Sequence, residues 1–442
     1  MVFFRRCLAM MRIIPGLLFL LSISGTASAQ QLIWEVEEQL SDGVDYPEAI
    51  VLTKAGVMVA GQAKGEGEGF EFVVQTLGRA TGKVKSTVGN FVSYNCPLRY
   101  VRCYNRRLVA HVSPNFYMVT FDVSPDGNQT DIAVTAFDEN SAAIKWMSYW
   151  NADNRYPAAI AASRQAVIVS SEGGALRAYD AVSGTMLWED QLDARLGYGV
   201  TVAIAGNRAF AAAATPNSEL QVRSYNARSG RLRWEVRRPF PVRPVKLLVN
   251  GADLFVAGSS DVFIAGNLTW SGTERLPYLA RLEAGTGLTV WENTTDVVET
   301  SGGHLSELAV DGDRIVAAGG VVMGPTVSGF VRSYQVSDGQ VNWTTARLWG
   351  GYDEPTAIAV HGNRVYGVGA RGELGGLAEV LLRAYDAGTG AIVWEDFSHR
   401  AAPSIIGPSH AIDLAVGEHR LFVAGFVPNH FLIRAYDISG DW

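Results

Sequence analysis

The segment LRAYDAVSGTMLWED, which begins at Leu176, returns almost unchanged at Leu382 as LRAYDAGTGAIVWED. Weaker copies share the pattern AxDxxTGxxxW, and the recognisable copies begin at Ala136, Ala178, Ser224, Arg281, Ser333 and Ala384. An eroded copy spans 76–86, and a truncated copy starts at Ala435. The copies recur roughly every 50 residues, and a unit of that length with four short strands is typical of a β-propeller blade.

A second recurring phrase precedes each copy, as in AIAVHGNRVYGVG (357–369) and LAVDGDRIVAAGG (308–320). Apolar residues lie on both sides of a short polar turn in these phrases, which is the pattern of a β-hairpin. We name its strands A and B. The AYDA phrase is then strand C, the Thr-Gly or Ser-Gly pair is a tight turn, and the tryptophan lies on strand D.

The chain holds eight sets of strands A, B and C, but the eighth set ends at Asp441 and Trp442 without a strand D. The segment LIWEVEE (32–38) matches MLWEDQL and IVWEDFS, which are strands D of other sets. The repeats therefore predict that residues 30–442 form one all-β domain, an eight-bladed β-propeller of four-stranded antiparallel blades. We expect residues 32–38 to complete the last blade, because this pairing covers an otherwise open sheet edge.

The recurring tryptophans have a structural interpretation. Strand D is the outermost strand of a blade, and a large flat side chain can reach from it to the next blade. Burying such a ring contributes up to about 5 kcal/mol. We expect this docking role for Trp34, Trp146, Trp188, Trp234, Trp291, Trp343 and Trp394.

The first residues have the features of an export signal. Arg5, Arg6 and Arg12 precede the apolar run IIPGLLFLLSIS, and the small residues 27–29 follow it. We expect a signal peptide over 1–29 and a secreted or periplasmic mature protein; a membrane anchor is the alternative. No later stretch is apolar enough to span a bilayer.

Removal of the three signal arginines changes the net charge from −7 to −10, which opposes binding to nucleic acid and to anionic surfaces. The mature chain would keep two cysteines, Cys96 and Cys103. Oxidising conditions outside the cytoplasm favour a disulfide between them, and two free buried thiols are the alternative.

Functional residues are expected where the B–C and D–A connections lie, because these are long and variable whereas the A–B and C–D turns are tight. Three histidines fall on this side, His399, His410 and His430, without metal-binding spacing; solvated loop histidines are the simpler interpretation. The segment RLWGGYDEP (347–355) suits protein or sugar contacts, and a packed loop is its alternative.

The repeated AxDxxTGxxxW pattern resembles the tryptophan-docking motif of the quinoprotein-like (PQQ-like) β-propellers and covers nearly all of the mature chain. That superfamily includes PQQ-dependent alcohol dehydrogenases, which typically hold PQQ with calcium and a disulfide between adjacent cysteines. It also includes non-catalytic BamB-type propellers. The chain has no adjacent cysteines and resembles the BamB type more closely.

The resemblance implies an exported, non-enzymatic scaffold that binds another protein or an envelope polymer and works as a monomer. We predict no catalytic residue, cofactor or metal. The alternatives are a PQQ-dependent oxidoreductase and a hydrolase or lyase that acts on polysaccharide.

Overall fold

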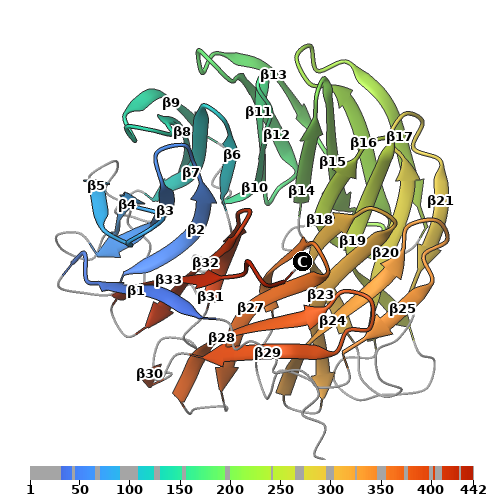
Figure 1. Ribbon diagram of the computed structural model, residues 1–442. Coiled ribbons are helices and arrows are strands. Elements are labelled where there is room, and N and C mark those ends of the chain that lie inside the picture. Colours follow the sequence, from blue (N-terminus) through green and yellow to red (C-terminus); the bar gives the residue numbers. More distant parts are fainter. Residues whose placement is uncertain are drawn as a thin grey trace, which may run out of the picture.

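The computed structural model describes residues 31–41, 45–64, 70–89, 108–123, 130–151, 156–194, 200–239, 242–263, 273–294, 303–323, 326–345, 355–372, 377–397, 402–403, 411–427 and 430–441. These residues form strands and turns, without helices, and no part of them could cross a membrane as a helix. Eight antiparallel sheets form a ring (Figure 1). The predicted eight-bladed propeller is confirmed.

Blades 1 to 4 follow one another along the chain, each with strands A to D in order. Blade 1 consists of β2 (Tyr46–Leu52), β3 (Val57–Lys64), β4 (Phe70–Leu77) and β5 (Val84–Val88). Blade 2 consists of β6 (Val109–Val112), β7 (Asn115–Val123), β8 (Thr130–Asp138) and β9 (Ile144–Asn151). Blade 3 consists of β10 (Pro157–Ala162), β11 (Ala166–Ser171), β12 (Ala175–Asp180) and β13 (Met186–Gln191). Blade 4 consists of β14 (Val200–Ala205), β15 (Arg208–Ala214), β16 (Leu220–Asn226) and β17 (Leu232–Arg238).

Blades 5 to 7 repeat this order, and blade 8 takes its strand D from the other end of the chain. Blade 5 consists of β18 (Val242–Asn250), β19 (Asp253–Phe263), β20 (Thr273–Glu283) and β21 (Thr289–Asn293). Blade 6 consists of β22 (Gly303–Asp311), β23 (Arg314–Met323), β24 (Thr326–Gln335) and β25 (Val341–Thr344). Blade 7 consists of β26 (Pro355–His361), β27 (Arg364–Gly372), β28 (Leu377–Asp386) and β29 (Ile392–Phe397), with the short β30 (Ala402–Pro403). Blade 8 consists of β31 (Ala411–Val416), β32 (Arg420–Val427), β33 (His430–Asp437) and β1 (Leu32–Glu38).

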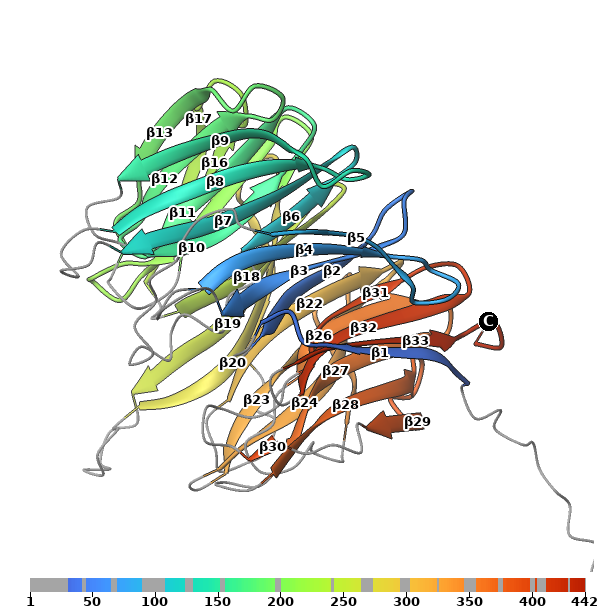
Figure 2. The same ribbon diagram turned by 90° about the vertical axis from the view of Figure 1, so that its left-hand side faces the viewer.

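The ring closes as the sequence predicted. Strand β1 pairs antiparallel with β33, and Trp34 lies opposite Ala435 (Figure 2). The Glu35 carboxylate accepts a hydrogen bond of 2.5 Å from the Arg434 guanidinium across this pair. The N-terminal strand therefore completes the last blade through both backbone and side-chain contacts.

Every blade except blade 1, which has Ser86 at this position, contacts the next through the tryptophan of strand D. In six of these seven blades the indole Nε1 donates to a backbone carbonyl in the C–D turn of the following blade, as from Trp188 to Ala227 at 2.8 Å and from Trp343 to Ala387 at 3.0 Å. The turn glycine beneath the ring has a positive φ, +70° at Gly230, where an added Cβ would lie 2.5 Å from the Trp188 ring. Only glycine fits this approach.

Glycine is required on strand B for a different reason, the close approach of strand A. Strand A carries a register shift at the same place in six blades, and the partner position on strand B is glycine in most of them. At Gly258 an added Cβ would lie 2.0 Å from the Arg243 carbonyl, and at Gly319 it would lie 1.8 Å from the His304 carbonyl. The bulge brings strand A so close that no side chain fits opposite it.

Much of the sequence expected to be loop is strand. The B–C connection of blade 5 is one of those expected to be long, but β19 and β20 pair as far as Phe263 and Thr273. Strands β27 and β28 likewise pair through Gly372 and Ala378. The B–C connections of blades 5 and 7 are thus largely hairpin arms, which backbone pairing makes stiffer than loops. In blade 7, β30 pairs with the outer part of β28.

Candidate functional site

The two ends of the strands define two faces of the ring. The turn face carries the A–B and C–D turns, and all of these are short: Asn250 pairs with Asp253, and His361 pairs with Arg364, across two residues. The loop face carries the B–C and D–A connections and the hairpin arms of blades 5 to 7. Only the loop face varies from blade to blade, so it is the candidate for partner recognition.

Several residues singled out in the sequence lie outside the described residues. These are the signal region 1–29, Cys96, Cys103, His399, His410 and segment 347–354. His430 lies at the start of β33, and His419 lies in the A–B turn on the opposite face.

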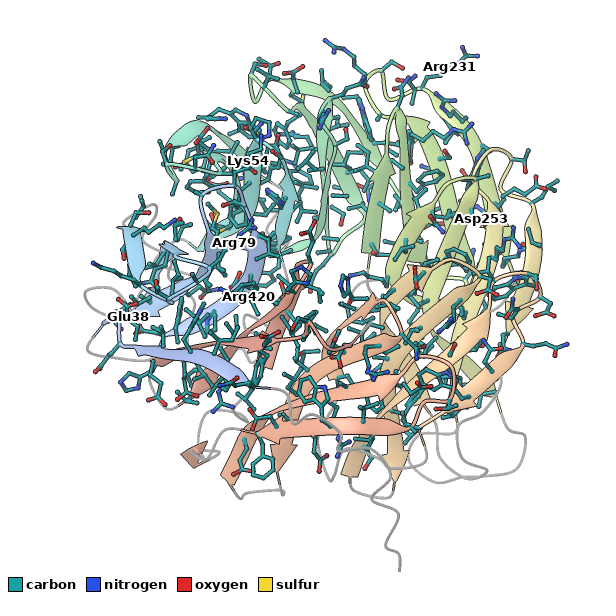
Figure 3. The ribbon with its side chains drawn as sticks, in the orientation of Figure 1. Glu38, Lys54, Arg79, Arg231, Asp253 and Arg420 are labelled. Carbon is teal, nitrogen blue, oxygen red and sulfur yellow. The ribbon has the colours of Figure 1, made fainter. Side chains whose placement is uncertain are left out.

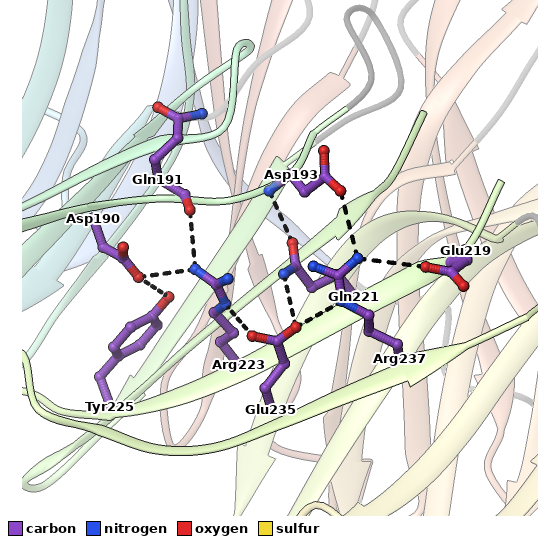
Figure 4. Close-up of polar contacts among 9 residues, drawn as sticks. All are labelled: Asp190, Gln191, Asp193, Glu219, Gln221, Arg223, Tyr225, Glu235 and Arg237. Atoms are coloured by element: carbon purple, nitrogen blue, oxygen red, sulfur yellow. Dashed lines mark hydrogen bonds and ion pairs between the residues drawn. The ribbon is translucent and has the colours of Figure 1, made fainter. Parts of the chain in front are cut away.

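The most developed polar cluster lies where blades 3 and 4 meet, toward the loop face (Figure 4). Arg223 of β16 bonds Glu235 of β17 at 2.7 Å and reaches Asp190 of β13 at 3.1 Å. Asp190 also accepts a hydrogen bond from the Tyr225 hydroxyl at 2.7 Å. Arg237 extends the cluster to Asp193 and Glu219. We call these residues the seam network.

The contacts of the seam network keep Glu235 ionised and Tyr225 protonated. Burial alone would raise the pKa of Glu235, but hydrogen bonds from Arg237, Gln221 and Arg223 outweigh it and lower the pKa to about 2. Burial, followed by the bond to Asp190, raises the pKa of Tyr225. Both groups keep one protonation state at neutral pH. Gln221 also accepts from the backbone N–H of Asp193 at 3.0 Å, which anchors the start of the D–A connection after blade 3.

A second set of charged groups lies on the inner strands A. Glu48 of β2 accepts a hydrogen bond from the Gln62 side chain. Burial raises the pKa of the Glu48 carboxyl to about 7, and the bond from Gln62 opposes this rise. Asp413 of β31 accepts from the Ile50 backbone N–H at 3.1 Å, and Lys246 pairs with Glu307 at 2.9 Å. The last two contacts join neighbouring blades, blade 8 to blade 1 and blade 5 to blade 6.

Nowhere in the part of the chain that the structure describes do three His, Cys, Asp or Glu side chains gather in a way that could hold a metal ion. The sequence also lacks the adjacent cysteines that the resemblance implies for PQQ-dependent alcohol dehydrogenases.

The sequence contains a recurring pattern that could have predicted the seam network, although we did not predict it. Arg177, Arg223, Arg383 and Arg434 occupy one position of strand C, and a glutamate follows the tryptophan on the paired strand D. The register places these opposite each other, as Arg177 with Glu189 and Arg383 with Glu395. Two phrases continue as WED, and their aspartates reach the tyrosine of the next blade: Asp190 to Tyr225 and Asp396 to Tyr436.

Solved structures share the architecture at low sequence identity. BamB from Moraxella catarrhalis has a TM-score of 0.52 and 13% identity, and the match covers 93% of this chain and 98% of that one. Quinohemoprotein alcohol dehydrogenase ADHIIG from Pseudomonas putida HK5 has a TM-score of 0.55 and 13% identity, over 93% of this chain and 76% of that chain. A computationally designed protein, Ika8, has a TM-score of 0.54 and 12% identity, over 91% and 100%. These likenesses show the fold alone.

The family of the chain follows from its sequence. No curated protein sequence matches the chain. A family model described as outer membrane protein assembly factor BamB matches residues 130–273 and 277–430, which is more than half of the chain. These residues contain strands C and D of blade 2, blades 3 to 7 apart from residues 274–276, and strands A and B of blade 8. The chain therefore belongs to the BamB family of PQQ-like β-propellers.

Proposed function

We propose that the protein is an exported, non-enzymatic binding scaffold that recognises another protein or an envelope polymer through its loop face. The observation that carries this proposal is the difference between the connections on the two faces. Every turn of the turn face is short, whereas the connections and hairpin arms of the loop face differ in each blade. A rigid ring that varies on one face presents that face to a partner.

Three further features support the proposal. The family model is described by a role in outer membrane protein assembly, which fits an envelope location and a protein partner. The seam network fixes the base of the D–A connection after blade 3 through the bond from Asp193 to Gln221. The arms of blades 5 and 7 are paired strands, so a partner would meet surfaces that are ordered before binding, which lowers the entropic cost of association.

The test shortens one arm without touching the ring. Ser259 and Pro277 are cross-strand partners on β19 and β20. Replacing residues 260–276 by Asn-Gly keeps this pair and closes it with a two-residue turn. We expect an unchanged melting temperature and at least tenfold weaker cross-linking to the partner found with the wild-type protein in envelope extract.

The matched control exchanges the A–B turn residues 251–252 of the same blade for Asn-Gly, which alters only the turn face. We expect this control to retain full cross-linking. Equal cross-linking by the shortened variant would contradict the assignment of the loop face. A bound quinone spectrum together with alcohol-dependent dye reduction, after addition of PQQ and Ca²⁺, would instead establish an oxidoreductase.

A further inference from the structure

Exposed apolar side chains gather on the turn face of blades 2 to 5. Nine large apolar side chains are exposed in the described part of the chain, and six of them lie in a C–D turn or in the first two residues of strand D of these blades. They are Ile144, Val182, Met186, Leu232, Leu288 and Val290. Val182 is 76% exposed and Leu288 is 64% exposed. Single exposed apolar residues are ordinary, but their concentration at one rim marks an interaction surface.

Blade 4 adds arginines to the middle of this rim. Its two turns and the residues directly after them carry Arg208, Arg228, Arg231 and Arg233, and no acidic residue. Five other blades have Asp or Glu at the start of the C–D turn, whereas blade 4 has Asn226, whose side-chain oxygen accepts the same backbone hydrogen bonds from residues 228 and 229. Arg231 lies at the outer edge of the ring (Figure 3).

These arginines are weakly compensated by their surroundings. Arg228 forms a long ion pair with Asp180, at 3.8 Å, and the Arg233 guanidinium donates to the Asn207 carbonyl, at 3.5 Å. The structure gives the Arg231 side chain no ion pair with a described residue. The acidic groups nearby are already engaged: Asp180 accepts from the backbone of Val182 and Ser183, and Asp253 pairs with Arg281 at 2.9 Å.

We propose that this rim, formed by the turns of blades 2 to 5, docks on an anionic lipid bilayer. Guanidinium groups bind lipid phosphates, and the aliphatic side chains beside them can enter the boundary between headgroups and acyl chains. The side chains spread over the tips of neighbouring blades, and this breadth suits an extended planar partner. The rim lies on the face opposite the proposed partner site, so both could be occupied together.

The negative net charge of the chain does not prevent this docking. At physiological ionic strength the Debye length is about 8 Å, so exposed charges elsewhere on the ring are largely screened at the rim. The local sign of the charge, which is positive here, then decides whether lipid phosphates are attracted.

The test measures co-sedimentation of the purified protein with vesicles of equal parts phosphatidylglycerol and phosphatidylcholine, and with vesicles of phosphatidylcholine alone. We expect binding to the anionic vesicles only, weakened by salt. Arg231→Glu should lower the partition coefficient about tenfold. A double variant, Val182→Ser with Leu288→Ser, should lower it about fivefold at an unchanged melting temperature.

Lys83→Glu is the matched control, because Lys83 is an exposed cation on the turn face of blade 1, outside the rim. We expect Lys83→Glu to change the partition coefficient by less than about twofold, because a single distant surface charge is largely screened. Absence of wild-type binding to the anionic vesicles would overturn the proposal, as would equal losses for Lys83→Glu and Arg231→Glu. Failure of this test would leave loop-face recognition unaffected, since the shortened-arm variant tests that separately.

Discussion

The seam between blades 3 and 4 and the seam between blades 1 and 2 use equivalent positions in different ways. At the first seam, Trp188 stacks on Tyr225 with ring centroids 5.2 Å apart, over Gly230. At the second seam, Ser86 takes the tryptophan position and Ala142 takes the glycine position, with φ of 55°. The glycine is lost where the indole is lost, because only the indole requires the space.

A second pair of positions changes in the same coupled way. Asp190 and Tyr225 form a hydrogen bond at the first seam, whereas Val88 and Phe137 occupy these positions at the second. Val88 packs against the cluster of Met58, Phe116 and Phe137. A buried hydroxyl without an acceptor is costly, so the tyrosine is kept only where the preceding blade offers a polar partner.

The sequence shows the same correlation of residue types around the whole ring, and the structure shows the hydrogen bond itself for Asp190 with Tyr225 and for Asp396 with Tyr436. Where the residue two places after the tryptophan position is valine, the next blade has no tyrosine: these pairs are Val36 with Leu77, Val88 with Phe137, and Val236 with Leu282. Where that residue is polar, the next blade has tyrosine: these pairs are Ser148 with Tyr179, Asp190 with Tyr225, Asn293 with Tyr334, Thr345 with Tyr385, and Asp396 with Tyr436. Each seam thus specifies its two sides together.

The largest expected difference between the seams concerns the docking position itself. Trp188→Ala removes a nearly buried indole and its hydrogen bond to Ala227, so it should lower the free energy of unfolding by about 3 to 5 kcal/mol. Ser86→Ala, at the same position of blade 1, should change it by less than about 0.5 kcal/mol. Chemical denaturation of both variants measures the difference, and similar losses would remove the distinction between the seams.

Exchanging glycine and alanine in the C–D turns tests the same difference between the two seams at the residue beneath the ring. Gly230→Ala places a Cβ against the Trp188 ring at a positive φ and should cost about 2 to 4 kcal/mol. Ala142→Gly relieves the same backbone conformation without an indole above it and should be neutral to within about 0.5 kcal/mol. Thermal melts of the two variants give the comparison; a cost for Ala142→Gly as large as that for Gly230→Ala would refute it.

Glu48 inside blade 1 and Glu235 at the seam of blades 3 and 4 should contribute to stability with opposite dependence on pH. The pKa of Glu48 is raised from 4.5 to about 7, so the protonated form favours folding, and this contribution is lost as the pH rises from about 4.5 through 7. At pH 8, Glu48→Gln should therefore stabilise the protein by about 1 to 3 kcal/mol. Glu235 has a lowered pKa, so Glu235→Gln should destabilise it at the same pH. Glu235 loses its contribution as the pH falls from about 4.5 toward 2, so melting temperatures between pH 3 and 8 would show whether the signs differ.

The smallest expected effect is the coupling between Asp190 and Tyr225. Each single change, Asp190→Val or Tyr225→Phe, leaves one partner without the other. The double variant reproduces the arrangement of Val88 and Phe137, so a double-mutant cycle should give about 1 kcal/mol of favourable coupling. Additive effects would mean that the pairing around the ring has no energetic basis at this seam.

The sequence was sufficient to predict the number of blades and the closing strand, because each copy of AxDxxTGxxxW repeats the same packing. It did not reveal the hairpin arms of blades 5 and 7. Glycine-rich stretches such as Gly369 to Gly376 suggest loops, whereas backbone pairing at Ala370 and Arg371 continues the strands. The seam network was also missed, since the contact between Asp190 and Arg223 depends on how adjacent blades approach each other and not on local spacing.

The pairing of β1 with β33 sets an order of events for the newly made chain. Strand β1 leaves the ribosome before β33 and must wait for it, roughly 400 residues later, and closing so large a loop is slow. Until then, blade 8 keeps an open edge that other chains can join. Biogenesis of this ring therefore depends on a late meeting of its two ends, and any factor that shields strand 32–38 in the interval would raise the yield of folded protein.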